Sequence, residues 1–241
     1  MASDPITSST TTLSLQPPPG TLLQSYNLSL PALSPLQSPT IPQTLKDSFS
    51  VRENVFVNEQ RAVPLQHHID SDDARSYHWL LYSNQSLNSP HIPIGTVRLV
   101  PPPHYPHPEP GARFEAPHQD VPAPDPKILF NTPLPPHVVD RKTSLHDGIE
   151  PYVKLGRLSV VKEYRGKKFA DLLIQEALGW AKKKENRGLF SGGEEEREWK
   201  GLVCIHAQEG AVKAWERNGF IVDEGMGTWF EGGIRHTPPA D

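Results

Sequence analysis

Basic side chains gather at one point of the chain where acidic ones are expected. Arg165, Lys167 and Lys168 surround Gly166, immediately before an amphipathic stretch. The first turn of a helix carries unpaired N–H groups and a partial positive charge, so each cation there costs about 0.3–1 kcal/mol unless an anion binds among them. This spacing predicts an anion site, typically for a phosphate. A solvated basic turn is the alternative interpretation.

Two elements must position this basic turn. Apolar residues alternate from residue 153 and become continuous at 160–161, which predicts a strand buried on both faces. From residue 169 they recur every three or four positions, which predicts an amphipathic helix. No GxxxxGK(S/T) motif is present and no GxGxxG follows a strand, so a P-loop and a dinucleotide fingerprint are excluded.

The strand, turn and helix together resemble a known signature. The segment LGRLSVVKEYRGKKFADLLIQEAL is similar to the acyl-CoA signature of the GNAT superfamily of N-acyltransferases, Q/R-x-x-G-x-G/A between a strand and a helix. Arg165 fills its first position and Ala170 its last, while Lys168 stands at the middle glycine. Five further segments follow the order of the ElaA-like branch, in a fungal-type form with Pro-rich insertions: VRENVFVNEQ (51–60), HHIDSDDARSYHWLLY (67–82), GTVRLV (95–100), CIHAQEGAVKAWERNGF (204–220) and FEGGIRH (230–236).

This resemblance implies an α/β fold of GNAT type. Its central sheet is mixed and mostly antiparallel, flanked by helices on both faces and splayed between the fourth and fifth strands. Hydrophobic periodicity predicts further helices at 45–59 and 209–218 and further strands at 21–30, 77–82, 94–100, 201–206, 220–222 and 227–230. Residues 1–19, rich in Ser, Thr and Pro, are expected to form a disordered tail, and residues 20–241 one domain.

Two segments interrupt this domain. Residues 101–150 are rich in proline and show no sustained periodicity, and residues 188–198 are polar. A long irregular loop is often functional, so the first insertion is interpreted as a lid or as an arm that binds a partner through its Pro-rich motifs. A solvated loop without function is the alternative.

Composition narrows the function classes. A net charge of −4 and a pI near 6.3 argue against nucleic-acid binding. The single cysteine, Cys204, precludes an internal disulfide and suits a reducing compartment. No apolar run is long enough to span a bilayer, and the first 45 residues contain no Lys or Arg, which disfavours a secretory or transit peptide. We therefore expect an intracellular, cytoplasmic protein without a membrane partner. A nuclear location remains open.

The resemblance also implies acetyl-CoA as co-substrate, with pantetheine lying along the strand and pyrophosphate on the N–H groups of the turn. Trp215 falls where many relatives have a tyrosine that protonates the leaving thiolate, and an indole N–H is no useful acid. A lysine at position 168, unlike a glycine, is expected to adopt an ordinary backbone conformation. The residues assigned to the cofactor are Leu158, Ser159, Val160, Arg165, Gly166, Lys167, Lys168, Phe169, Ala170 and Trp215.

Acyl transfer to an amine needs a proton acceptor and a donor to the oxyanion, here the N–H of Val160. Glu59, His206 and His236 are the candidate proton carriers, because each lies in a matched segment expected near the acceptor. Their structural alternatives are a surface carboxylate, a core histidine and a tail histidine. Other clustered residues repeat no known metal-binding spacing, so they are expected in solvated loops and no metal is expected. They are His67, His68, Asp70, Asp72, Asp73, His104, His107 and His118.

Together these features predict an acyl-CoA-dependent N-acyltransferase that moves acetyl from acetyl-CoA to a primary amine by direct transfer in a ternary complex. A small-molecule amine, such as a polyamine or amino sugar, is favoured over a protein lysine. Lys168 and Trp215 leave open a catalytically weak or inactive CoA-binding module or interaction scaffold. A homodimer and a partner for the Pro-rich motifs also remain open.

Overall fold

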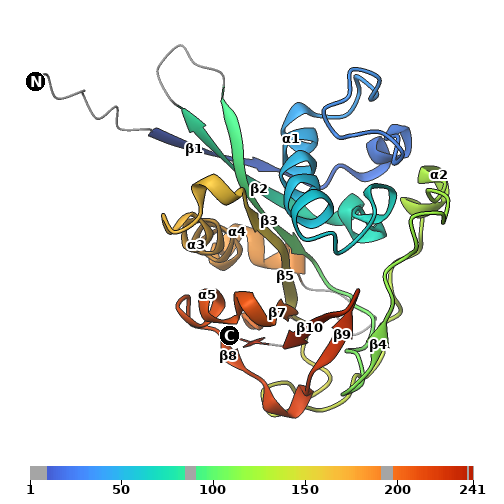
Figure 1. Ribbon diagram of the computed structural model, residues 1–241. Coiled ribbons are helices and arrows are strands. Elements are labelled where there is room, and N and C mark those ends of the chain that lie inside the picture. The colour runs from blue at the N-terminus through green and yellow to red at the C-terminus, as the bar shows by residue number, and fades with distance from the viewer. Residues whose placement is uncertain (1–9, 85–90, 191–197, 238, 241) are drawn as a thin grey trace, which may run out of the picture.

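A seven-stranded sheet forms the centre of the computed structural model, which describes residues 10–84, 91–190, 198–237 and 239–240 (Figure 1). Its strands, in spatial order, are β1 (Thr10–Gln16), β2 (Tyr77–Asn84), β3 (Ile92–Val100), β5 (Val153–Val160), β6 (Val203–Ile205), β11 (Pro239–Ala240) and β8 (Ile221–Val222). All neighbours in this sheet are antiparallel except β5 and β6. The mixed, mostly antiparallel sheet expected from the sequence is therefore confirmed.

A smaller sheet and several helices complete the fold. The smaller sheet contains, in order, β4 (Arg113–Phe114), β9 (Trp229–Glu231), β10 (Ile234–Thr237) and β7 (Ala207–Gln208). The α-helices are α1 (Gln43–Arg52), α2 (Pro126–Leu129), α3 (Phe169–Lys182), α4 (Lys184–Arg187) and α5 (Val212–Glu216), and α1 continues as a π-helical segment, Glu53–Glu59. Among the described residues, no helix combines the length and apolar content that a membrane crossing requires.

Side chains of β2 show which helix covers which face of the sheet. Trp79 and Leu81 are buried in the cluster that contains the apolar side of α3. Leu80 and Tyr82 pack instead with Val51 of α1. Because successive strand residues point to opposite faces, α1 and α3 cover opposite faces of the sheet, as Figure 1 also shows.

The Pro-rich insertion and the smaller sheet cover the rest of the face that α1 occupies. Cys204 of β6 packs with Tyr152 and Trp229, while its neighbours Val203 and Ile205 belong to the cluster around α3. Within the insertion, which the structure describes throughout, regular elements amount to β4 and α2. Its side chains nevertheless contribute to the packed interior.

Part of the expected N-terminal tail is ordered, contrary to the prediction. Residues 10–16 form β1, which pairs antiparallel with β2 along its whole length. Leu13 and Leu15 alternate with polar residues and pack against the cluster around α3. The Ser/Thr-rich composition concealed this period of two. Residues 1–9 of the expected tail lie outside the described residues.

The expected first strand at 21–30 is also wrong. Gly20–Ser25 forms a 3-10 helix, and the glycine that opens it has a φ of +56°. Leu23, Tyr26 and Leu28 are buried against α1 in a separate apolar cluster. The alternating apolar residues therefore reflect burial within an irregular segment, which the three preceding prolines prevent from joining a ladder.

The other expected elements are present with shifted bounds, and four further short strands were missed: β4, β7, β10 and β11. The helix expected at 45–59 is α1 with its π-helical continuation. Strand β10 was not foreseen, and Gly232 and Gly233, at positive φ, join it to β9 in a hairpin. Of the polar insertion at 188–198, residues 191–197 lie outside the described residues.

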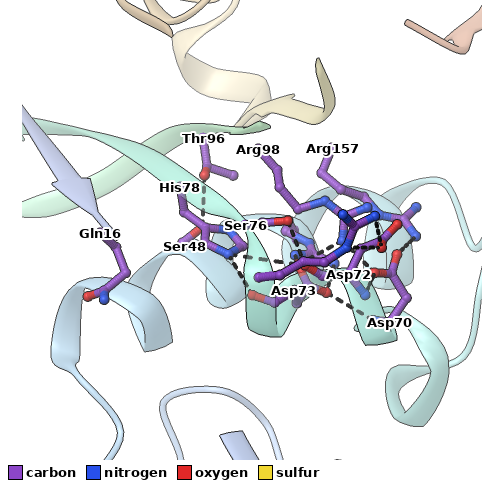
Figure 2. Close-up of polar contacts among 12 residues, drawn as sticks. Gln16, Ser48, Asp70, Asp72, Asp73, Ser76, His78, Thr96, Arg98 and Arg157 are labelled. Atoms are coloured by element: carbon purple, nitrogen blue, oxygen red, sulfur yellow. Dashed lines mark hydrogen bonds and ion pairs between the residues drawn. The ribbon is translucent and has the colours of Figure 1, made fainter. Parts of the chain in front are cut away.

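A buried ion network fastens the α1 side of the molecule to the sheet (Figure 2). Arg52 of α1 contacts both carboxylate oxygens of Asp73, at 2.6 and 3.1 Å. Arg98 of β3 donates to Asp73 at 2.8 Å and to Asp70 at 2.6 Å. Asp70 also accepts a 2.7 Å bond from Arg157 of β5. Burial alone would raise the pKa of both carboxyl groups, but the arginines outweigh it and hold each pKa below its usual range.

These contacts contradict part of the expectation of solvated loops. Asp70 and Asp73 form a capping box at the 3-10 helix Ser71–Arg75, with Asp73 fully buried. His68 lies beside them, and burial lowers its pKa to about 4. This acidic cluster is therefore a structural junction between α1, β3 and β5.

Loss of the Asp73 carboxylate should destabilise the fold strongly. We expect Asp73→Asn to lower the free energy of unfolding by about 3–5 kcal/mol, because Arg52 and Arg98 would remain buried beside a neutral partner. The matched control is Asp72→Asn, which removes a partly exposed pair with Arg75 and should cost about 0–1 kcal/mol. Urea unfolding measures both, and equal losses would contradict the central role of Asp73.

Protonation of buried histidines should make stability depend on pH. His78 is fully buried behind the network, and burial lowers its pKa to about 4. The unfolded chain binds the proton at a pH near 6.5, so stability is complete above that value and falls by about 1.4 kcal/mol per pH unit and per histidine as the pH drops toward 4. Unfolding followed from pH 7 to 5 should show a shallower slope in His78→Gln. The exposed control, His118→Gln, should keep the parent slope; an unchanged slope in His78→Gln would refute the assignment.

Candidate functional site

Strand β5 has a free edge over part of its length. It pairs with β6 over Val153–Leu155, whereas its pairing with β3 continues to Val160. Among the described residues, no strand is recorded against the β6 side of residues 156–160. The predicted splay between the fourth and fifth strands concerns this pair, β5 and β6.

A bulge bends β5 where this free edge begins. Thr96 faces Ser159 and Arg98 faces Gly156, so Arg157 and Leu158 together oppose a single residue of β3. Arg157 has a φ of +52°, a conformation that costs a residue other than glycine about 1–2 kcal/mol. Its guanidinium donates to Asp70 at 2.7 Å in a partly exposed ion pair. The signal for this bulge was the glycine at 156 inside a strand pattern.

Along β5, the backbone N–H and C=O groups of successive residues point alternately to β3 and to the opposite edge, where a ligand could bond to them. Val161 donates its N–H to Ile94 of β3 at 2.9 Å, so Ser159, two residues earlier, also directs its backbone groups to β3. Those groups are not free for a cofactor, contrary to the prediction for Ser159. Leu158 and Val160 point the other way, and the carbonyl of Val160 accepts a 2.9 Å bond from Nε of Arg165. The N–H of Val160 remains available.

The turn into α3 presents further free N–H groups. Gly166 has a φ of +75°, and Lys168, the N-cap of α3, has a φ of +62°. The expectation of an ordinary conformation at Lys168 is therefore wrong. Within the described part of the chain, no acceptor is recorded for the backbone N–H groups of residues 166–171. Arg165 was predicted to belong to this array, but its backbone N–H donates to the carbonyl of Lys162.

The one acidic side chain in the first turn of α3, Asp171, is bonded to residues that follow α5. Asp171 accepts bonds from Arg217 at 3.2 Å and from Asn218 at 2.9 Å, both at the end of α5. Lys167 lies with Nζ 5.1 Å from the ring centre of Tyr164. A helix terminus with several adjacent cations can hold an anionic group.

Glu59, the first candidate proton carrier, is already paired. Both of its oxygens accept bonds from Arg165 at 2.6 Å, and these bonds are the main reason that its pKa is lowered. A lowered pKa makes a carboxylate a weaker base. The pair also ties the end of the π-helical segment to the basic turn. The role of Glu59 in proton transfer and that of Arg165 in cofactor binding stay predictions.

The other two candidates, His206 and His236, gather around Trp229. The ring of His206 meets Trp229 edge to face at 4.6 Å, and burial lowers its pKa well below the usual value. His236 lies parallel to Trp229 at 6.1 Å and contacts the carbonyl of Ile234 through Nδ1 at 3.0 Å. The structure therefore brings these two histidines together and places Glu59 with Arg165 instead.

Several other sequence predictions change once side chains are placed. Trp215 is 3% exposed and packs edge to face on Phe220 at 5.2 Å, within the core around α3. His104 and His107, expected in solvated loops, are enclosed: the ring of His104 stacks on Tyr152, and His107 is 5% exposed. The long insertion carries no local signal for this burial, because its partners lie on the sheet.

Comparisons with known proteins give similarity in fold. No family model matches the chain and no curated protein matches it. Escherichia coli ElaA is 19% identical, covering 96% of this chain and 99% of that chain at a TM-score of 0.49. An acyl-CoA N-acyltransferase from Pseudomonas aeruginosa is 16% identical, and the match covers 81% of this chain and 88% of that chain at a TM-score of 0.47. Arabidopsis thaliana NAA60, solved in complex with a bisubstrate analogue, is 13% identical, and the match covers 95% of this chain and 97% of that chain at a TM-score of 0.43. Similarity at this level assigns no activity to this chain.

Glycine at position 168 should relieve strain. A positive φ costs lysine about 1–2 kcal/mol, while glycine costs about 0.5–1 kcal/mol in unfolded-chain entropy. Lys168→Gly should therefore raise the free energy of unfolding by up to about 1.5 kcal/mol. The matched control, Lys167→Gly, changes a neighbour without positive φ and should destabilise. Chemical unfolding measures both, and a similar loss in the two variants would contradict the strained turn.

Proposed function

We propose that the chain is an acyl-CoA-dependent N-acyltransferase that transfers acetyl from acetyl-CoA to a primary amine in a ternary complex. The observation that carries this proposal is the array of N–H groups at residues 166–171 that have no partner within the described part of the chain, following the edge of β5 that no described strand pairs with. The array suits the pyrophosphate of CoA, and the edge beside Leu158 and Val160 offers backbone partners to the pantetheine arm. The resemblance of residues 155–178 to an acyl-CoA signature supports the same assignment.

Transfer would proceed by attack of the neutral amine on the thioester carbonyl. The N–H of Val160 would stabilise the oxyanion, the C–S bond would break, and CoA would leave as a thiolate. The amine proton passes to a base. His236 is the favoured carrier, because Glu59 is held by Arg165 while Nε2 of His236 has no recorded partner among the described residues.

A small-molecule amine is the favoured acceptor, with a protein lysine as the variant within the same class. Burial of Trp215 in the core supports a second candidate, a CoA-binding module with little or no turnover, since no acid stands at that position for the leaving thiolate. The two candidates share the CoA site and differ in product formation.

Thiol release tests the activity directly. Wild-type protein with acetyl-CoA and a panel of polyamines, amino sugars, amino acids and a lysine peptide should release CoA with one amine class. Binding of CoA in calorimetry with no release from any amine would instead identify the binding module. Failure to bind CoA would refute both candidates.

Charge reversal at the turn should weaken CoA binding selectively. Lys167→Glu replaces a charge-assisted contact, worth about 1.5–3 kcal/mol, with repulsion, so CoA affinity should fall by about 10-fold or more. Lys182→Glu is the matched control, since this exposed lysine lies in the last turn of the same helix. It should leave affinity unchanged. Equal affinity in Lys167→Glu and wild type would overturn the phosphate assignment.

A further inference from the structure

The Pro-rich insertion brings a histidine to a cysteine and a histidine on the sheet. Cys204 lies in β6 and His206 follows that strand directly. His107 comes from the insertion, and its Nδ1 is 3.3 Å from Nε2 of His206. One ligand atom from each of the three residues lies within 4.8 Å of the others. Two imidazole nitrogens and one sulfur therefore face a common point.

The side chains of this cluster are largely enclosed by aromatic rings. Cys204 is 3% exposed and His107 is 5% exposed. The ring of His107 stacks on Tyr152, with centroids 5.2 Å apart, and the ring of His206 is held by Trp229. A metal ion bound here would therefore meet donor groups whose rings are already oriented.

A carboxylate stands behind His107 in the position that supports a ligand. Asp140 accepts the backbone N–H of His107 at 2.9 Å, and the same oxygen lies 3.7 Å from Nε2 of the ring. That nitrogen is the one turned away from His206. Histidines that bind metals generally direct their second nitrogen to a carboxylate or carbonyl, which fixes the ring and its tautomer.

We propose that His107, Cys204 and His206 bind one zinc ion through Nδ1, Sγ and Nε2, with a water in the fourth position. Two nitrogens and one thiolate form a borderline-soft donor set of the kind that zinc takes in tetrahedral geometry. Binding replaces the thiol proton of Cys204, which passes to solvent. The ion fastens the insertion to β6 beside the small sheet. This site is independent of the proposed acyl transfer.

Cobalt titration of the metal-free full-length protein tests the site, because Co²⁺ reports its ligands in the visible and near-ultraviolet spectrum. We expect one equivalent to bind with a thiolate-to-cobalt charge-transfer band, and zinc to displace it. Cys204→Ser should lose that band, and His107→Ala and His206→Ala should each weaken binding. Asp140→Asn should keep the band while affinity falls by about 10–100-fold, as for the loss of an outer partner.

The matched control is His118→Ala, which removes an exposed histidine of the same insertion and should bind cobalt as wild type does. Circular dichroism of each metal-free variant checks folding. Zinc should also raise the melting temperature of wild type and not that of His107→Ala, a readout that does not depend on the cysteine variant. Absence of the charge-transfer band in wild type, or its persistence in Cys204→Ser, would overturn the proposal.

Discussion

The network of three arginines and two aspartates, of which Arg52, Asp73 and Arg98 are buried, is the constraint on which the rest of the structure depends. It joins α1 through Arg52, the sheet through Arg98 and the bulge of β5 through Arg157. Burying a charged side chain costs free energy unless an oppositely charged partner contacts it, so this network stabilises one arrangement of the three elements and penalises others. Arg157, at positive φ, donates to Asp70 next to the point where the pairing of β5 with β6 ends.

That bend leads directly to the candidate anion site. Residues after the bulge keep their pairing with β3, so Leu158 and Val160 turn their backbone groups to the free edge. The turn that follows holds Lys168 at positive φ, and its N–H groups have no partner among the residues that the structure describes. Backbone atoms thus form most of the proposed CoA site. A lysine can replace the signature glycine there because the required feature is a conformation, which the surrounding fold imposes at a cost of about 1–2 kcal/mol.

The Pro-rich insertion has little secondary structure, yet it belongs to the packed interior. Its histidines stack on Tyr152 and reach β6, and Asp140 ties two of its distant parts together through His107. A segment of this kind owes its order to tertiary contacts rather than to local hydrogen bonds. The proposed zinc ion would add to these contacts, since it would bind one residue of the insertion and two at β6 and so hold the insertion on the sheet.

The sequence by itself determined the strand, basic turn and helix from residue 153 onward, because periodicity and charge act over a few neighbouring residues. It also predicted most elements of the sheet and the helices on both faces. Tertiary structure alone decided that residues 10–16 pair with β2, that Glu59 is held by Arg165, and that His107 meets His206. The partners in each case are far apart in the chain, so no local pattern encodes their meeting. The positive φ of Lys168 likewise runs against the preference of lysine itself, so the residue type alone does not encode it.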